Sequence, residues 1–289
     1  MEKLAIVILL SVFSFMSYGQ TNGNKQNNTS KDGVTDSIVW TLLIKPHIVY
    51  SSETVSDSAA AYYKKGTEKF YSEDYKGAIE DYSKAIEFNF NYMAAYTNRG
   101  ISKGEFGDYK GAIGDYDKVI SLDPDDAFVY CYRGAAKSRL GEMEGAVADF
   151  DKALTIDPEH TLAYLNRGTI KYVAGDYEGA LTDYSKAIEI RPNAIFHLVR
   201  AAVKHEMGDY EGEIADYRQS FIYSTPNAEL YNRLGRALYE QKQYEDALKV
   251  YDEGISVYPT DHDLYYGLEQ ACNQLNDKDK TCLLYTSPS

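Results

Sequence analysis

The chain has 289 residues and a formal net charge of −14 at pH 7, with 44 acidic and 30 basic residues. This excess of negative charge argues against a nucleic-acid partner, because phosphate binding needs clustered Lys and Arg side chains. The sequence also shows no phosphate-binding glycine loop, nucleophile motif or metal-ligand spacing. We therefore expect a protein that is not an enzyme and that holds no metal and no cofactor.

The chain begins with a secretory pattern. Residues 1–19 combine a charged start, an apolar run over residues 4–16 and small residues before Gln20. This pattern predicts a cleaved signal peptide, because the apolar run is shorter than the roughly 20 residues that a membrane-spanning helix needs. We expect export across the inner membrane to a periplasmic or extracellular location, with no membrane span in the mature chain. Residues 20–36 are polar and predict a flexible leader.

Residues 37–58 form an apolar segment between this leader and the rest of the chain. The run over residues 38–50 contains the only tryptophan, Trp40, and is interrupted by Pro46. One interpretation is a cap that covers the first structural unit. The other is a segment that occupies a groove of the same chain or pairs with a partner.

From residue 59 onward the sequence repeats itself every 34 residues. Glycines recur at Gly66, Gly100, Gly134 and Gly168. Aromatic residues precede them at Tyr62, Tyr96, Tyr130 and Tyr164, and alanines follow at Ala78, Ala112, Ala146 and Ala180. Small and aromatic residues at helical spacing, interrupted by Gly-Asp-Tyr and Asp-Pro turns, predict two short helices per unit. One such hairpin cannot bury its apolar face alone, so neighbouring units must stack.

This pattern resembles the tetratricopeptide repeat. The resemblance covers residues 59–276, with units beginning at residues 59, 93, 127, 161, 194 and 228 and a capping helix from residue 262. It implies an all-α fold, a right-handed superhelical solenoid of helix-turn-helix repeats. It also implies a non-catalytic scaffold for protein–protein interaction.

Three repeat positions carry recurring charges, and at two of them the family usually has Leu or Tyr. The most regular sets are Arg99, Lys103 and Asp115; Arg133, Lys137 and Asp149; and Arg167, Lys171 and Asp183. The first and fifth units have Lys65, Lys69 and Asp81, and Arg200, Lys204 and Asp216, whereas the sixth has Leu234, Leu238 and Val250. Because an isolated buried charge is costly, we predict a structural charge ladder in which each Asp pairs with Lys and Arg within or between neighbouring units.

The family resemblance also implies a partner-binding groove on the first helix of each unit. The corresponding residues are Tyr63, Thr67, Phe70, Thr97, Ile101, Phe128, Cys131, Leu162, Leu165, Tyr172, Leu198 and His205. This apolar, nearly uncharged set favours a protein or peptide partner that presents an amphipathic helix or a hydrophobic extended segment. The alternative is that residues 38–50 or a second copy of the chain cover this face.

Two further features concern the fifth unit and the C-terminus. Glu213 replaces a small residue at a close helix contact, and we expect it to reach Lys204 or His205. Residues 277–289 form a tail, and residues 282–289 resemble a translated sequencing adapter, so we expect a truncated chain. Two other functions therefore stay open: the binding module of a larger secreted protein whose catalytic or envelope-binding domain is lost, and a self-assembling structural protein. Cys131 and Cys272 fall in different units and are expected to be unpaired.

Overall fold

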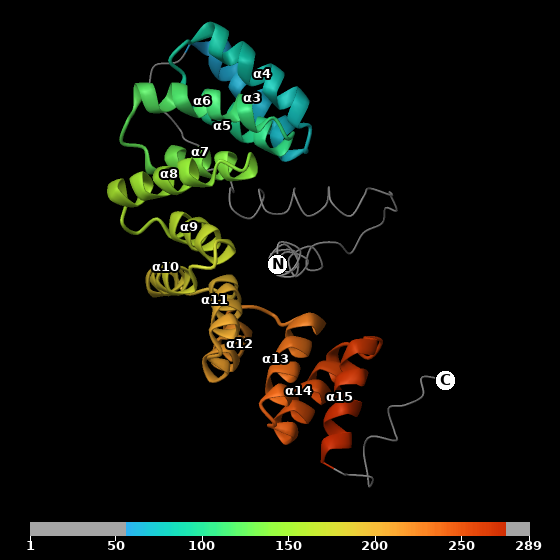
Figure 1. Ribbon diagram of the computed structural model, residues 1–289. Helices are drawn as coiled ribbons and strands as arrows, with labels where there is room; N and C mark the ends of the chain where they lie inside the picture. The colour runs from blue at the N-terminus through green and yellow to red at the C-terminus, as the bar shows by residue number, and fades with distance from the viewer. Residues whose placement is uncertain (1–55, 276–289) are drawn as a thin grey trace. The chain divides into compact units, whose positions relative to one another are not determined.

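The computed structural model describes residues 56–275, which contain thirteen helices and no strand (Figure 1). The predicted signal peptide, leader, apolar run over residues 38–50 and C-terminal tail lie outside the described residues. Within the described part, no helix combines the length and the apolar character that crossing a membrane requires. The fold class is an all-α helical repeat solenoid, in agreement with the sequence.

The helices alternate between a first and a second helix of each repeat. The first helices are α3 (Asp57–Tyr71), α5 (Met93–Glu105), α7 (Ala127–Arg139), α9 (Thr161–Val173), α11 (Ala194–Met207) and α13 (Ala228–Glu240). The second helices are α4 (Tyr75–Phe88), α6 (Tyr109–Leu122), α8 (Met143–Ile156), α10 (Tyr177–Ile190), α12 (Tyr210–Tyr223) and α14 (Tyr244–Val257), and α15 (His262–Gln274) follows them.

In the second, fourth and fifth repeats, the turn between the two helices is set by a glycine and an aspartate. Gly107 and Gly175 have φ values of 89° and 82°, in the left-handed region that glycine enters without steric cost. The next residue, Asp108 or Asp176, caps the second helix, because its carboxylate accepts a hydrogen bond of 2.9 Å from the backbone N–H three residues later. The first helix therefore ends and the second begins within three or four residues.

The two helices of a repeat meet at the recurring glycine. A Cβ atom added to Gly100 would lie 2.6 Å from the Tyr116 ring, and one added to Gly134 would lie 2.8 Å from the Phe150 ring. The absence of a side chain on the first helix thus lets an aromatic ring of the second helix lie directly against its backbone. These rings are fully buried and form the centre of each hairpin.

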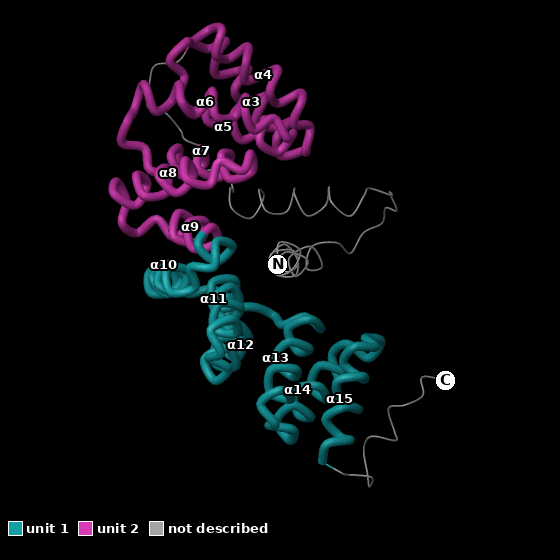
Figure 2. Tube along the Cα trace, viewed as in Figure 1, with its two compact units in different colours: residues 1–20, 171–289 teal, residues 21–170 magenta. Residues whose placement is uncertain are grey.

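The chain divides into two compact units, and the division falls inside α9 (Figure 2). We call residues 56–170 the N-terminal unit and residues 171–275 the C-terminal unit. The N-terminal unit has separate buried clusters around Tyr82, Tyr116 and Phe150. The C-terminal unit has one cluster that extends from Leu198 to Cys272.

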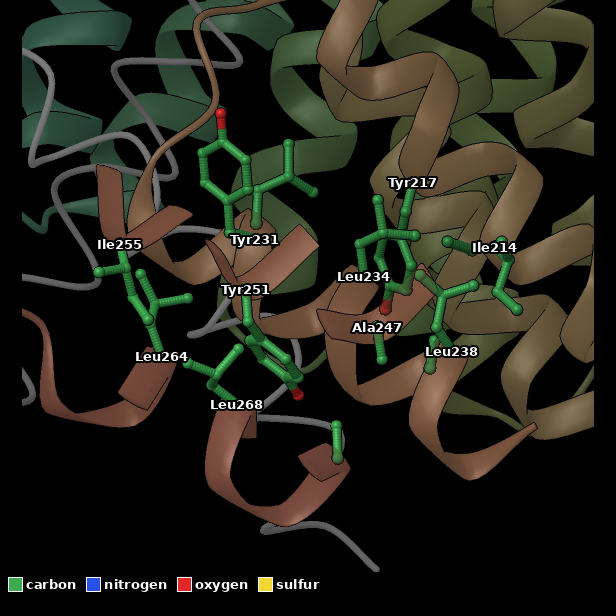
Figure 3. Packing of buried hydrophobic residues seen from close by; sticks show 14 of the residues in the cluster. Ile214, Tyr217, Tyr231, Leu234, Leu238, Ala247, Tyr251, Ile255, Leu264 and Leu268 are labelled. Carbon is green, nitrogen blue, oxygen red and sulfur yellow. The ribbon is translucent and has the colours of Figure 1, made fainter. Parts of the chain in front are cut away.

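Figure 3 shows part of the cluster of the C-terminal unit. Its members include Ile214 and Tyr217 from α12, Leu234 and Leu238 from α13, Tyr251 and Ile255 from α14, and Leu264 and Leu268 from α15. Cys272 belongs to the same cluster and is disulfide-bonded. The expectation of an unpaired Cys272 is therefore wrong, whereas Cys131 is free and buried.

Candidate functional site

The ladder carboxylates lie on second helices and face two cations on the first helix of the same repeat. Asp115 Oδ1 lies 2.6 Å from Arg99 Nη2, and Asp115 Oδ2 lies 2.8 Å from Lys103 Nζ. Arg99 Nε donates a second hydrogen bond to the same carboxylate at 2.9 Å, which makes the pair bidentate. The Asp115 side chain is only 5% exposed, so its charge depends on these partners.

The same arrangement recurs along both units. Asp149 binds Arg133 at 2.6 Å and Lys137 at 2.8 Å in the third repeat. In the other repeats, the same kind of contact joins Lys69 to Asp81 at 2.6 Å, Lys171 to Asp183 at 2.9 Å, Arg200 to Asp216 at 2.6 Å and Lys204 to Asp216 at 2.8 Å. Lys65 departs from the series, because it is exposed and its Nζ lies 5.2 Å from the centroid of the Tyr62 ring.

Each ladder arginine also reaches back to the preceding repeat. Arg133 Nη1 donates to Asp117 Oδ1 at 2.7 Å, and Arg167 Nη1 donates to Asp151 Oδ1 at 2.6 Å. At the equivalent places Arg99 Nη1 donates to Ser83 Oγ at 3.0 Å and Arg200 Nη1 to Ser185 Oγ at 3.2 Å. Sequence reasoning missed these acceptors, although Ser or Asp recurs two residues after the ladder aspartate in each of these repeats.

The residues predicted to line the groove differ in exposure. The buried ones are Tyr63, Thr97, Ile101, Cys131, Leu165, Tyr172 and Leu198. The ones that keep accessible surface are Thr67, Phe70, Phe128, Leu162 and His205. Four of these five belong to the N-terminal unit, and Phe128 is the most exposed of them at 37%. A partner that binds this face would contact these residues first.

Hydrogen bonds hold part of this face in place in the N-terminal unit. Asn98 Nδ2 donates to the Tyr63 hydroxyl at 2.8 Å, and the Tyr82 hydroxyl donates to Thr67 Oγ1 at 3.2 Å. Burial raises the pKa of Tyr82 to about 12, so the hydroxyl keeps its proton for this bond. Further along, Asn166 Nδ2 donates to the sulfur of Cys131 at 3.8 Å.

Comparison with known proteins identifies the family of these repeats. Models described as tetratricopeptide repeats match residues 59–92, 129–160, 161–194 and 228–261, and a model described as a TPR repeat matches residues 105–141. The chain is built from tetratricopeptide repeats. Proteins with such repeats generally serve as scaffolds for protein interaction. A comparison with curated proteins gave no match.

Solved structures show the same fold at low sequence identity. A tetratricopeptide repeat protein from Parabacteroides merdae is 20% identical, with 93% of this chain and 99% of that one covered and a TM-score of 0.54. PilF of Pseudomonas aeruginosa is 16% identical, with 77% and 100% covered and a TM-score of 0.62. PilW, a type IV pilus biogenesis factor, is 17% identical, with 74% and 99% covered and a TM-score of 0.62.

The fifth tetratricopeptide repeat has two polar contacts that involve histidines. His205 Nδ1 lies 3.0 Å from Glu213 Oε2, so the glutamate reaches His205, one of its two expected partners. Burial raises the pKa of Glu213, and the hydrogen bond from His205 opposes this shift.

A second contact in this repeat involves the ladder carboxylate Asp216, and the sequence analysis did not predict it. His197 Nδ1 lies 2.9 Å from Asp216 Oδ1, and its ring stacks on Tyr223. Burial raises the pKa of Asp216, but hydrogen bonds from Arg200, Lys204 and His197 outweigh burial and leave this pKa below its ordinary value. Asp216 therefore serves three donors at once and stays ionised.

Proposed function

We propose that this chain is a non-catalytic scaffold that binds a peptide or a helix of another polypeptide on the first-helix face of its N-terminal unit. The observation that carries the proposal is the separation of charge on the first helices. Arg99, Lys103, Arg133 and Lys137 are held by ladder carboxylates, whereas the face with Phe70 and Phe128 carries no charge at the predicted positions. Burial of apolar side chains of the partner would supply affinity there.

The ladder supports this function through preorganisation. Bidentate pairs such as Arg133 with Asp149 fix the first helix of a repeat against the second helix. A binding face that is already ordered loses little conformational entropy when it takes up a partner. The accessible residues Thr67, Phe70, Phe128 and Leu162 are therefore presented by a rigid frame.

The experiment is a selection of 15-residue peptides from a displayed random library against the full chain, followed by calorimetry on the selected peptides. Phe128→Glu should weaken binding by at least about tenfold, because it places a charge where apolar burial provides the affinity. The matched control is Phe90→Glu, since Phe90 is 72% exposed in the loop between α4 and α5 and should leave binding unchanged.

Two outcomes would contradict the proposal. A library that yields no binder would argue against a peptide scaffold altogether. Selected peptides that bind Phe128→Glu normally would place the partner on another surface. Circular dichroism of both variants checks that neither substitution unfolds the repeat.

We also propose that the protein acts outside the cytoplasm, on the strength of the pattern in residues 1–19. Expression of the full chain in a bacterial host should give a mature protein that begins at Gln20, as read by N-terminal mass spectrometry. Retention of residues 1–19 in a cytosolic product would contradict the proposal.

A further inference from the structure

The outward face of α3, formed by Ala61, Lys64 and Glu68, differs from the same face of the repeats that follow. At the equivalent positions the second and third repeats bury Ala95, Asn98 and Ser102, and Val129, Tyr132 and Ala136. In α3 all three residues are exposed, and no described repeat precedes them. An apolar segment placed on this face would have to bury two charged side chains, which is costly.

The apolar run over residues 38–50 lies outside the described residues and ends shortly before α3. Its only formal charge is Lys45. Its apolar members are Ile38, Val39, Trp40, Leu42, Leu43, Ile44, Ile48 and Val49. A run of this kind left in water is an aggregation hazard, so we expect another surface to cover it.

The first-helix face of the N-terminal unit matches this run better than the outward face of α3. Its accessible residues include Phe70 and Phe128, and none of the predicted positions in this unit carries a charge. Pro46 interrupts a helix and favours an extended segment, which presents alternate side chains to a surface. Apolar side chains of such a segment could be buried here without desolvating a charged group.

The chain is long enough to place the run on this face. Residues 51–55 link it to Ser56, the cap of α3, and an extended link of this length spans up to about 18 Å. Thr67 lies about 16 Å along α3 from Ser56. The helices α3, α5 and α7 of this unit contact one another in succession, with roughly 10 Å between neighbouring axes. The run spans about 43 Å when extended, so it can reach both Phe70 and Phe128.

We propose that residues 38–50 bind in extended form to the first-helix face of the N-terminal unit of the same chain and compete there with the polypeptide partner. This inference rests on the proposed function and concerns the regulation of the same face. A segment on a short link has an effective concentration in the mM range. An affinity of about 0.1 mM would keep it bound about nine-tenths of the time and weaken the apparent affinity for the partner about tenfold.

Trp40 gives a direct readout, because it is the only tryptophan in the chain. In the full chain its fluorescence should lie at shorter wavelength than in urea and should resist quenching by acrylamide. Phe128→Glu should weaken apolar binding about tenfold, lower the bound fraction from about nine-tenths to about one half, and move the emission toward that of the urea-unfolded chain. The matched control, Phe90→Glu in the loop between α4 and α5, should leave the emission unchanged.

Binding of a tryptophan-free 15-residue peptide from the library selection gives the second readout. Ile44→Glu should tighten this binding about tenfold, because it releases the competing segment. The matched control is Asn24→Glu, which adds the same charge to the predicted leader and should leave binding unchanged. Added to the unsubstituted chain, the peptide should move the Trp40 emission to that of the Ile44→Glu chain, because it displaces the segment.

Three outcomes would overturn the inference and leave the proposed function standing. The first is a Trp40 that acrylamide quenches equally in the native and the urea-unfolded chain. The second is a protected Trp40 that Phe128→Glu does not release, which would place the segment on another surface, such as the outward face of α3. The third is protection that increases with protein concentration, which would assign the segment to a second copy of the chain.

Failure of the proposed function gives a different result. In that case neither the unsubstituted chain nor the Ile44→Glu chain selects a peptide from the library, whatever the emission of Trp40. This result would also overturn the competitive role of residues 38–50. Circular dichroism of each variant checks that a released Trp40 does not reflect an unfolded repeat.

Discussion

The third and sixth repeats build the same helix pair with different chemistry between the helices. In the third repeat Arg133 and Lys137 of α7 face Asp149 of α8. In the sixth repeat Leu234 and Leu238 of α13 occupy the places of the two cations. Both repeats keep the close contact between a glycine and an aromatic ring. A Cβ atom added to Gly134 would lie 2.8 Å from the Phe150 ring, and one added to Gly235 would lie 2.6 Å from the Tyr251 ring.

The comparison separates what shapes the hairpin from what joins its neighbours. The glycine–aromatic contact is common to both repeats, so we infer that it sets the distance between the helices. The residues around it decide whether the remaining space is filled by paired charges or by a hydrophobic cluster. In the sixth repeat that cluster continues into α15, whereas in the third repeat Arg133 extends to Asp117 of the preceding repeat.

The largest expected effect comes from placing a cation in the apolar repeat. Leu238→Lys buries a charge at a fully buried position that has no ladder carboxylate, which should destabilise the protein by about 4 kcal/mol. Urea unfolding followed by circular dichroism measures the loss. Adding Val250→Asp, at the position of the missing carboxylate, should recover part of it. A double variant no better than Leu238→Lys would contradict the equivalence of the two repeats.

The converse change removes the carboxylate from the charged repeat. Asp149→Ala leaves Arg133 and Lys137 without their buried partner, which should cost about 3 kcal/mol in the free energy of unfolding and lower the melting temperature. Asp149→Asn keeps the shape and part of the hydrogen bonding and should cost less. A neutral Asp149→Ala would show that solvent already satisfies these cations.

A full exchange of chemistry should be much milder than the loss of one partner. The triple variant Arg133→Leu, Lys137→Leu and Asp149→Val gives the third repeat the residues of the sixth. Since apolar replacement of a buried ion-pair group is often neutral or favourable, we expect a change of about 1 kcal/mol or less, in either direction. A loss as large as that of Asp149→Ala would mean that the ladder is required for the packing of this repeat.

Glu105 and Asp115 offer the same contrast within one repeat, because only Asp115 has cationic partners. The pKa of Glu105 is about 7 in the fold, above the ordinary value of 4.5, so the folded state binds more protons between these values. Its contribution to stability therefore falls as pH rises through this window. Glu105→Gln should stabilise the protein by about 1 kcal/mol at pH 8, allowing for solvent screening, and by little at pH 4. Melting curves at both pH values measure the difference, and a larger gain at pH 4 would contradict the assignment.

The smallest effect concerns the link between repeats. Asp117 is 55% exposed, so its pair with Arg133 is screened by water. Asp117→Ala should lower stability by about 0.5 kcal/mol, measured by urea unfolding. A loss comparable to that of Asp149→Ala would show that the two acceptors of Arg133 are equally important.

The repeated residues made most of the fold predictable from the sequence. Gly100 and Tyr116 recur at one interval, and their spacing alone indicates a helical hairpin. The charged residues were equally visible, because Arg99, Lys103 and Asp115 keep fixed spacings. The second hydrogen-bond acceptor of each arginine was harder to predict, since this contact depends on how neighbouring repeats stack.

The exposure of single residues on the first-helix face could not be predicted in the same way. Ile101 and Phe128 are both expected on this face, yet Ile101 is fully buried and Phe128 is exposed. The pattern gives the side of the helix, whereas exposure depends on which neighbouring side chains fill the space beside it. The unpaired Oε2 atom of Glu105 was missed for the same reason, because no periodic signal marks a missing partner.

The arginine contacts between repeats bear on the order in which the array opens. Arg133 and Arg167 join neighbouring repeats through partly exposed carboxylates, which dissolved ions weaken. The fifth and sixth repeats are joined instead by the apolar cluster around Tyr217 and Leu234, and contacts of this kind are insensitive to screening. In a linear array, cooperativity follows the strength of the neighbour contacts. Ionic strength should therefore decide which junction separates first, so that one sequence unfolds as a single block at low salt and in stages at high salt.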